Sequence, residues 1–231
     1  LFVGNGLAFL ASASLVSTVM IPQPQLKASV ETQLRRVTHG IRLYLSIPRL
    51  RGLFALNLAV AAASAMVIVN TVIYVRETFG LPDSAVAWGL GAAGAGSILA
   101  ALTIPALLKR MSDRTMMLGG GVVLTAGLFA ASFIGVFAAL LVCWFVIGVG
   151  LAVVQTPAGR LVQRSSGSED RPALFAAQFS LSHLCWLVTY PVAGIAGNTL
   201  GLGPTALFLA AVSMVAVVLT VLVWPRRNAV A

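Results

Sequence analysis

Residues 178–197 read QFSLSHLCWLVTYPVAGIAG, a stretch that is apolar enough to cross a membrane and yet carries several hydrogen-bonding side chains. A helix that only anchors a protein in lipid gains nothing from such groups, because each polar side chain in hydrocarbon needs a partner. At about 100° per residue, four of them recur on one face of a helix. They are Gln178, Ser182, Cys185 and Thr189. The pattern predicts a polar stripe that faces other helices or a watery cavity.

His183 and Tyr190 share another face of this helix, turned by at least about 100° from the stripe. A histidine changes its charge near neutral pH and binds transition metals. His183 is therefore a candidate proton carrier or metal ligand, although a hydrogen bond between helices explains it equally well. One metal ion cannot easily bind both His183 and Cys185, because on a regular helix they point about 200° apart. Pro191 predicts a kink, since its ring frees a backbone carbonyl.

The composition of the 231-residue chain indicates a membrane protein. Hydrophobic residues make up 59% of it and charged residues only 9%, whereas a soluble domain carries about 25% charged residues. The apolar runs are about 20 residues long, which fits a hydrocarbon core of roughly 30 Å, and they lack the alternation of a barrel strand. We therefore predict an all-α, polytopic membrane bundle of seven transmembrane helices. The expected spans are Leu1 to Met20, Leu53 to Val75, Ser84 to Leu108, Thr115 to Ile134, Phe137 to Thr156, Ala173 to Gly197 and Thr205 to Trp224.

Two longer polar segments separate these spans. Residues 21–51 are basic and carry apolar residues every three or four positions, Ile41 and Leu45 among them. This pattern favours an amphipathic helix on the membrane surface, and a basic cytoplasmic loop explains its charge better than nucleic-acid binding does. We expect Pro157 to end the fifth span and residues 158–172 to form a loop.

The net charge of +9 is distributed unevenly along the chain. If residues 21–51, 109–114, 158–172 and 225–231 share one side of the membrane, that side holds 14 of the 15 Lys and Arg residues, and only Arg76 lies opposite. Cytoplasmic loops are rich in Lys and Arg, so this distribution predicts a cytoplasmic C-terminus. All six acidic residues fall in expected turns and loops, which leaves no carboxylate inside a span.

Further amides lie inside the expected spans, where a single amide either lines a cavity or joins two helices. The candidates for a substrate or proton path are therefore His183, Gln178, Ser182, Cys185, Thr189, Tyr190, Asn57, Asn70 and Gln155. Enzyme motifs are absent from the sequence, which has no phosphate-binding loop, no CxxC, no HExxH and no Ser–His–acid set. We expect a transporter that needs no cofactor. A membrane-embedded lipid enzyme and a non-transporting scaffold or receptor remain as alternatives.

Together these features resemble the C-terminal half of a major facilitator superfamily transporter. Such transporters have two six-helix halves that rock about a substrate held near the midplane of the membrane. The resemblance implies that residues 1–20 are the last helix of the N-terminal bundle, residues 21–51 the cytoplasmic linker, and residues 52–231 the C-terminal six-helix bundle. It also implies that the chain is a fragment, and that its partners are a small-molecule or ion substrate, protons, the lipid bilayer and a missing N-terminal half.

Residues 105–114 (PALLKRMSDR) are similar to a degenerate copy of the superfamily's Gly-x-x-x-Asp-Arg-x-Gly-Arg-Lys turn. Arg110 and Arg114 fall on its basic positions, while Lys109 replaces its acid. The resemblance implies a gating role for Arg110, Asp113 and Arg114, which otherwise form a solvated turn. Residues 190–197 resemble a remnant of the superfamily's Gly- and Pro-rich antiporter motif, through Tyr190, Pro191, Gly194 and Gly197. The resemblance implies that these residues have a role in conformational change.

Two stretches, residues 175–197 and 49–72, are similar to the branch that holds the enterobactin exporter and the nickel-resistance exporters. The resemblance implies efflux from the cytoplasm by a proton antiporter in the bacterial cytoplasmic (inner) membrane. The expected substrate is a metal ion such as nickel, a siderophore or a drug.

Overall fold

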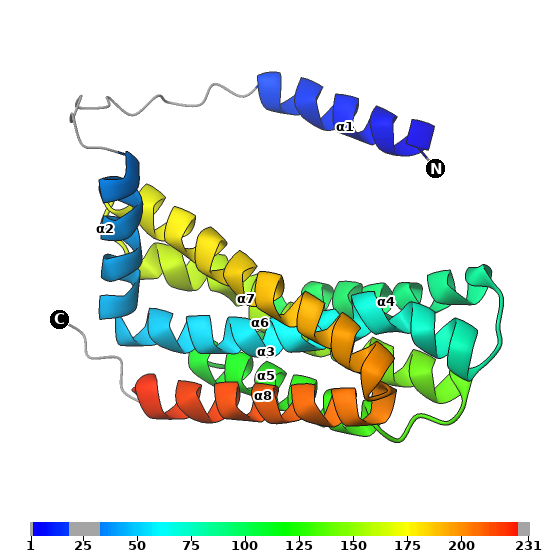
Figure 1. Cartoon of the computed structure of the whole chain (residues 1–231). Helices are drawn as coiled ribbons and strands as arrows, with labels where there is room; N and C mark the ends of the chain where they lie inside the picture. The colour runs from blue at the N-terminus through cyan, green and yellow to red at the C-terminus, as the bar shows by residue number, and fades with distance from the viewer. Residues whose placement is uncertain (1, 19–32, 226–231) are drawn as a thin grey trace. The chain divides into compact units, whose positions relative to one another are not determined.

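The computed structural model describes residues 2–18 and 33–225, and within these ranges the regular structure is entirely helical (Figure 1). The chain forms two units, Leu1–Thr32 and Gln33–Ala231. The first contains α1 (Phe2–Ser17), an apolar helix. The second contains α2 (Gln33–Ser46), α3 (Pro48–Ile73), the π-helix η1 (Tyr74–Thr78), α4 (Asp83–Leu107), α5 (Asp113–Ala131), α6 (Phe137–Arg164), α7 (Arg171–Thr199) and α8 (Leu202–Val223).

Six helices of the second unit are long and apolar enough to cross a membrane, with α3 and η1 counted as one. The predicted all-helical membrane fold is therefore confirmed, and the predicted count of seven spans is close. The difference lies in α1, which is apolar but, over its described residues, shorter than the other six.

The prediction that a span ends at Pro157 is wrong. Helix α6 passes through Pro157 and ends at Arg164, so the loop expected over residues 158–172 is reduced to a short turn. A proline removes one backbone hydrogen bond from a helix interior. The helix continues beyond it because Leu161 and Val162 are buried against the rest of the bundle.

Helix α3 forms the middle of the bundle. Figure 1 shows it running between α6 and α7 on one side and α5 and α8 on the other. In the most apolar 18-residue stretch of α3 and η1, 72% of the residues are buried, whereas the corresponding share is 22% in α4 and in α7. Thr220 of α8 donates a hydrogen bond to the carbonyl of Gly52 at 3.1 Å, and a Cβ at Gly52 would lie only 3.0 Å from the Trp224 ring.

Two glycines bring the backbones of α4 and α6 into direct contact. A Cβ at Gly148 would lie 2.0 Å from the carbonyl oxygen of Ala93, and a Cβ at Gly96 would lie 2.0 Å from that of Phe145. Ser97 joins the same contact by donating to the Gly148 carbonyl at 2.9 Å. Small residues at such positions let membrane helices approach closely.

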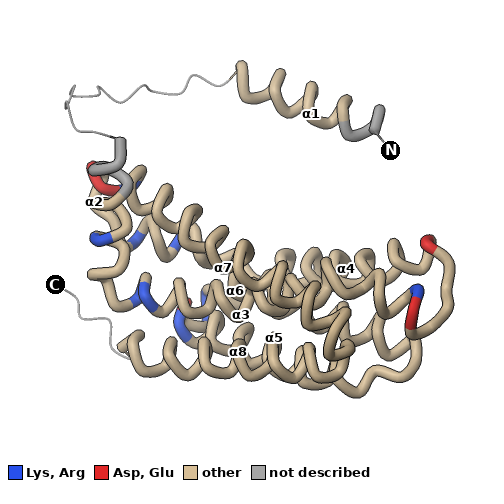
Figure 2. Tube along the Cα trace, in the orientation of Figure 1, with Lys and Arg blue, Asp and Glu red and all other residues tan. Residues whose placement is uncertain are grey.

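The charged residues of the second unit lie mostly at one end of the bundle. Successive spans run in opposite directions, so the starts of α3, α5 and α7 meet the ends of α4, α6 and α8, and Figure 2 shows Lys and Arg gathered there. At the opposite end Arg76 donates to Asp83 at 2.6 Å. The basic end carries Arg49, Arg51, Lys109, Arg110, Arg114, Arg160, Arg164 and Arg171.

Within the expected amphipathic segment, Gln33–Ser46 form helix α2, which lies beside the start of α7, and residues 21–32 lie outside the described residues. A Cβ at Gly40 would be 2.8 Å from the carbonyl oxygen of Ala173, so the two backbones nearly touch. Tyr44 is fully buried in this contact, whereas Leu45, on the predicted apolar face, is 38% exposed. Tyr44 therefore belongs to the face of α2 that packs on the bundle, and the expected position on the membrane surface stays a prediction.

Candidate functional site

A polar cavity of about 160 Å³ lies where α3, α6 and α7 meet. Asn57, Gln155, Gln178 and Ser182, four of the path candidates, all line it. The remaining lining residues are Val60, Ala158 and Trp186. On each helix the lining positions are three or four residues apart, so each helix contributes one face. No Asp, Glu, Lys or Arg is among the described residues that line the cavity.

Asn57 is the most deeply buried polar residue of the cavity wall, with 6% of its surface exposed. Its side-chain nitrogen Nδ2 is buried and has no hydrogen-bond partner among the described residues. A buried donor without a partner costs about 1–3 kcal/mol. A hydrogen-bond acceptor that entered the cavity would recover this cost, so the arrangement is suited to binding a polar solute.

Tyr44 connects α2 to the cavity wall. Its hydroxyl donates a hydrogen bond to Oε1 of Gln178. Burial raises the pKa of Tyr44 far above its ordinary value, which keeps the phenol protonated and able to donate. The sequence analysis missed Tyr44, although an aromatic residue on the apolar face of a basic amphipathic segment was an available signal.

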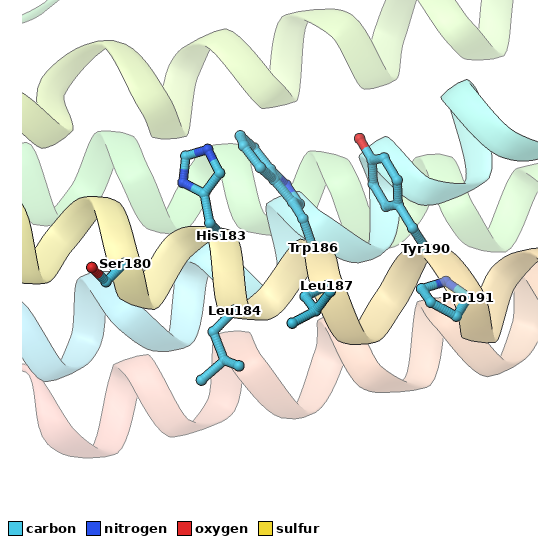
Figure 3. Close-up of a pocket in the computed structure, with 7 residues that line it drawn as sticks. All are labelled: Ser180, His183, Leu184, Trp186, Leu187, Tyr190 and Pro191. Carbon is cyan, nitrogen blue, oxygen red and sulfur yellow. The ribbon is translucent and has the colours of Figure 1, made fainter.

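His183 lies on the exposed side of α7, next to the cavity rather than in it. Its Nδ1 is 2.8 Å from the carbonyl oxygen of Phe179, and its ring centroid lies 3.9 Å from that of Phe179 and 4.8 Å, edge to face, from that of Trp186. Figure 3 shows His183, Trp186 and Tyr190 pointing to the same side of α7. His183 and Tyr190 therefore share a face, as the helical spacing predicts.

These residues belong to a shallow hollow of about 630 Å³ along α7. It is lined by Ser180, His183, Leu184, Trp186, Leu187, Tyr190 and Pro191. Trp186 lines both this hollow, which we call the aromatic hollow, and the polar cavity. The two spaces therefore adjoin at one side chain.

The other half of the predicted stripe faces the bundle interior. Cys185 and Thr189 are buried, and the Thr189 hydroxyl has no hydrogen-bond partner among the described residues. His183 and Cys185 lie on differently exposed sides of α7, in keeping with the spacing argument against a shared metal ion. Within residues 2–18 and 33–225, no group of three or more His, Cys, Asp or Glu could hold a metal ion. A metal bound by His183 alone stays a prediction.

Asn70 does not line the cavity but joins α3 to the far half of α7. It is fully buried, and its Nδ2 donates to the carbonyl of Ala193 at 3.3 Å. A Cβ at Gly197 would lie 2.4 Å from Oδ1 of Asn70, and a Cβ at Gly194 would meet Val69 at 3.4 Å. The two glycines thus permit close helix packing just beyond Pro191, which α7 accommodates in its interior.

At the basic end of the bundle, Asp113 binds two arginines of α6. It pairs with Arg160 and lies 3.4 Å from Arg164, with only 11% of its side chain exposed. Ser112 caps the start of α5 by accepting from the Thr115 N–H at 3.2 Å. Sequence analysis missed Arg160 and Arg164, because it placed both in a loop.

Arg114 extends these contacts to α8. Its Nε donates to the carbonyl oxygen of Trp224 at 2.9 Å, and its Nη2 lies 3.4 Å from the carbonyl oxygen of Val221. A cation at a helix C-terminus is favourable, because unpaired carbonyls give that end a partial negative charge. Asp113 and Arg114 are therefore not a simple solvated turn, while Arg110 is exposed. Their gating role stays a prediction.

Six helices long and apolar enough to cross a membrane, three of which line a polar cavity, define a multi-pass membrane protein. The family model of the Major Facilitator Superfamily matches residues 53–231, which include nearly all of α3 and every later helix. The chain therefore belongs to the Major Facilitator Superfamily, a family of membrane transporters. A comparison with curated proteins found no match.

Proposed function

We propose that the protein is a secondary active transporter that exports a small solute by alternating access, with protons as the coupling ion. The observation that carries the proposal is the polar cavity, where Asn57, Gln155 and Gln178 converge from three helices of an apolar bundle. Polar groups inside a membrane bundle are costly unless they are paired, so one that is unpaired among the described residues, such as Asn57 Nδ2, favours a path or a binding site. Membership of the superfamily makes small molecules or ions the expected cargo.

The proposed arrangement places the basic end of the bundle, and with it the C-terminus, in the cytoplasm of a bacterial cell, since Lys and Arg favour the cytoplasmic side of the inner membrane. Residues 1–20 then end an N-terminal bundle, residues 21–51 form the linker, and residues 52–231 form the second bundle. The exposed face of α7, which carries His183, would turn toward the N-terminal half across the transport path.

Export rests on the resemblance of residues 175–197 to the enterobactin and nickel exporters. Nickel, a siderophore and a drug are accordingly the three substrates to compare. His183 is the candidate proton carrier, because it is the one histidine within the six long helices.

The test uses inverted membrane vesicles from cells that produce the full-length protein. Respiration acidifies the vesicle interior, and a proton-coupled exporter dissipates this gradient when its substrate is added outside. We expect one of nickel, an iron-loaded siderophore or an uncharged aromatic drug such as chloramphenicol to release the acridine-orange quench. The release should be absent from vesicles without the protein.

Variants connect the measurement to the cavity. Asn57→Leu and Gln155→Leu should abolish the solute-dependent release, while Asn198→Leu, a change at an exposed amide outside the cavity, should leave it intact. Proton release that survives both cavity changes would refute the proposed path. A protein that moves none of the three solutes and no protons would refute the transport proposal itself.

A further inference from the structure

We propose that the polar cavity and the aromatic hollow form one binding site for an uncharged solute that carries an aromatic ring beside a hydrogen-bond acceptor, such as a carbonyl oxygen. This inference rests on the proposed transport function and names the class of its substrate. Four observations carry it: the shared wall of the two spaces, the absence of charge, the unpaired donor and the aromatic surface.

The shared wall is Trp186, which lines both spaces. The polar cavity measures about 160 Å³ and the hollow about 630 Å³. A molecule of water takes up about 30 Å³ in the liquid, so the cavity has room for one polar group and the hollow for a ring system beside it. A solute that spans both spaces would therefore be polar at one end and flat and apolar at the other.

The cavity wall favours an uncharged solute. Its lining consists of amides, a hydroxyl and apolar groups, with no ionic side chain among the described residues. An ion that enters a cavity with such a lining loses its hydration without gaining an opposite charge. This loss costs far more free energy than the burial of a neutral polar group. The carboxylate of Asp113, at the basic end of the bundle, is paired with Arg160 and Arg164.

The wall also favours an acceptor on the solute. Nδ2 of Asn57 is a buried donor without a partner among the described residues. Oε1 of Gln178 already accepts a hydrogen bond from Tyr44. A carbonyl oxygen on the solute would pair with the Asn57 donor, whereas a solute that only donates would leave it unpaired.

The hollow supplies an aromatic surface for the ring. Three of its lining residues carry rings, His183, Trp186 and Tyr190, and His183 meets Trp186 edge to face. Aromatic pairs at such distances attract one another beyond the area that they bury. A saturated ring of the same size would bury similar area without this contribution.

The experiment measures binding of four matched probes to the full-length protein in phosphatidylcholine nanodiscs, by saturation-transfer difference NMR. The probes are 2-naphthamide, 2-naphthoate, 2-naphthylmethylamine and decahydronaphthalene-2-carboxamide, and signals from empty nanodiscs are subtracted. We expect 2-naphthamide to bind at least about fivefold more tightly than the other three, a ratio that corresponds to about 1 kcal/mol. The two charged probes lose their hydration in an uncharged cavity, and the saturated amide lacks the aromatic ring.

Variants locate the site. Asn57→Leu should weaken the binding of 2-naphthamide about fivefold, because it removes the donor, and Gln155→Leu, at an exposed position of the wall, should weaken this binding without affecting folding. Trp186→Leu should abolish the preference for the aromatic over the saturated amide. Trp88→Leu is the matched control, because Trp88 is 70% exposed and lies outside both spaces.

Stronger binding of either charged probe, equal binding of the saturated amide, or no binding by any probe would overturn the inference. So would an affinity for 2-naphthamide that neither Asn57→Leu nor Trp186→Leu lowers. Each of these results leaves the transport proposal standing if the vesicles still move protons with another solute. If the probes bind in the expected order but no solute releases the acridine-orange quench in the vesicles, the binding site is supported and the transport proposal is refuted.

Discussion

The hydrogen bond from Tyr44 to Gln178 ties helix α2 to the wall of the polar cavity. One bond between neutral partners contributes about 0.5–1.5 kcal/mol to stability. Its position gives it further weight, because Gln178 faces the cavity and its orientation depends on this single donor. A substitution at Tyr44 would therefore alter the orientation of Gln178 in the cavity wall, although Tyr44 itself does not line the cavity.

We expect Tyr44→Phe to lower the free energy of unfolding by about 1 kcal/mol at neutral pH, because it removes only the hydroxyl. Burial raises the pKa of Tyr44 in the folded protein, whereas in the unfolded chain it ionises near its ordinary value of about 10. The contribution of the buried neutral phenol is thus complete below about pH 10 and is lost as the pH rises further. Thermal unfolding of the wild type and the variant across pH checks this.

Tyr190→Phe is the control, because Tyr190 is half-buried on α7 and lies outside the polar cavity. The gap in melting temperature between the wild type and Tyr44→Phe should be constant from about pH 6 to about pH 9 and then narrow. A gap that widens above about pH 10, or a Tyr190→Phe loss of equal size, would contradict the assignment.

At single positions, polar residues in apolar runs are conspicuous in the sequence. Three of them, Asn57, Gln155 and Gln178, line one cavity, and their place on a transport path stays a prediction. The analysis could not separate Asn70 from them, because a cavity amide and an amide between helices look identical in sequence. Tyr44 was missed because its role depends on Gln178, which is 134 positions away.

Among the helices, α4 and α6 make the closest contact, because glycines remove the side chains between their backbones. The Ser97 hydroxyl adds a hydrogen bond across the same contact. The two helices are therefore suited to move as one piece. The polar cavity, in contrast, separates the faces of α6 and α7.

We expect Gly148→Ala to destabilise the bundle by about 1–3 kcal/mol, the usual cost of overpacking a core. The new methyl group would lie 2.0 Å from the Ala93 carbonyl oxygen, which belongs to the backbone and cannot rotate away. Thermal unfolding in detergent measures the change. Gly159→Ala, on the same helix with nothing within 4 Å, should leave the melting temperature unchanged, and equal behaviour of the two variants would argue against the contact.

Helix positions were predictable because each span is a long apolar run, but helix ends were not. Pro157 has the residue type that usually ends a helix, and yet α6 extends to Arg164 because Leu161 and Val162 pack against its neighbours. That packing is tertiary information, which a local pattern does not contain. The start of α3 at Pro48, ahead of the expected Leu53, reflects the preference for proline in the first turn of a helix.

For the whole molecule, the distribution of charge separates two ends. The basic end holds the ion pairs of Asp113 and the contacts of Arg114, and the opposite end holds the pair of Arg76 and Asp83. The sequence analysis grouped the basic segments by alternating the spans, and their described Lys and Arg residues, from Arg49 to Arg171, lie at one end, while residues 226–231 lie outside the described residues. It could not identify α3 as the central helix, because burial depends on which helices are neighbours.

Membrane sidedness can be measured with two cysteine variants. Thr78→Cys lies at the end that carries Arg76, and Ser168→Cys lies in the turn between α6 and α7 at the basic end. In intact cells a membrane-impermeant maleimide should label Thr78→Cys only, and Ser168→Cys should react after permeabilisation, because basic loops stay in the cytoplasm.

The native Cys143 and Cys185 are both buried, so the wild-type protein should give little background. Labelling of Ser168→Cys in intact cells, with Thr78→Cys protected, would place the basic end outside and contradict the proposed orientation.

The central place of α3 has a consequence for the order in which the protein is made. Helix α3 leaves the ribosome first among the six long helices, while its neighbour α8, joined to it through Thr220 and Gly52, leaves last. Until α8 arrives, one side of α3 must be shielded by lipid or by the insertion machinery. A premature stop codon before residue 202 would leave that side permanently uncovered, which marks such a truncated chain for degradation by membrane quality control rather than for partial activity.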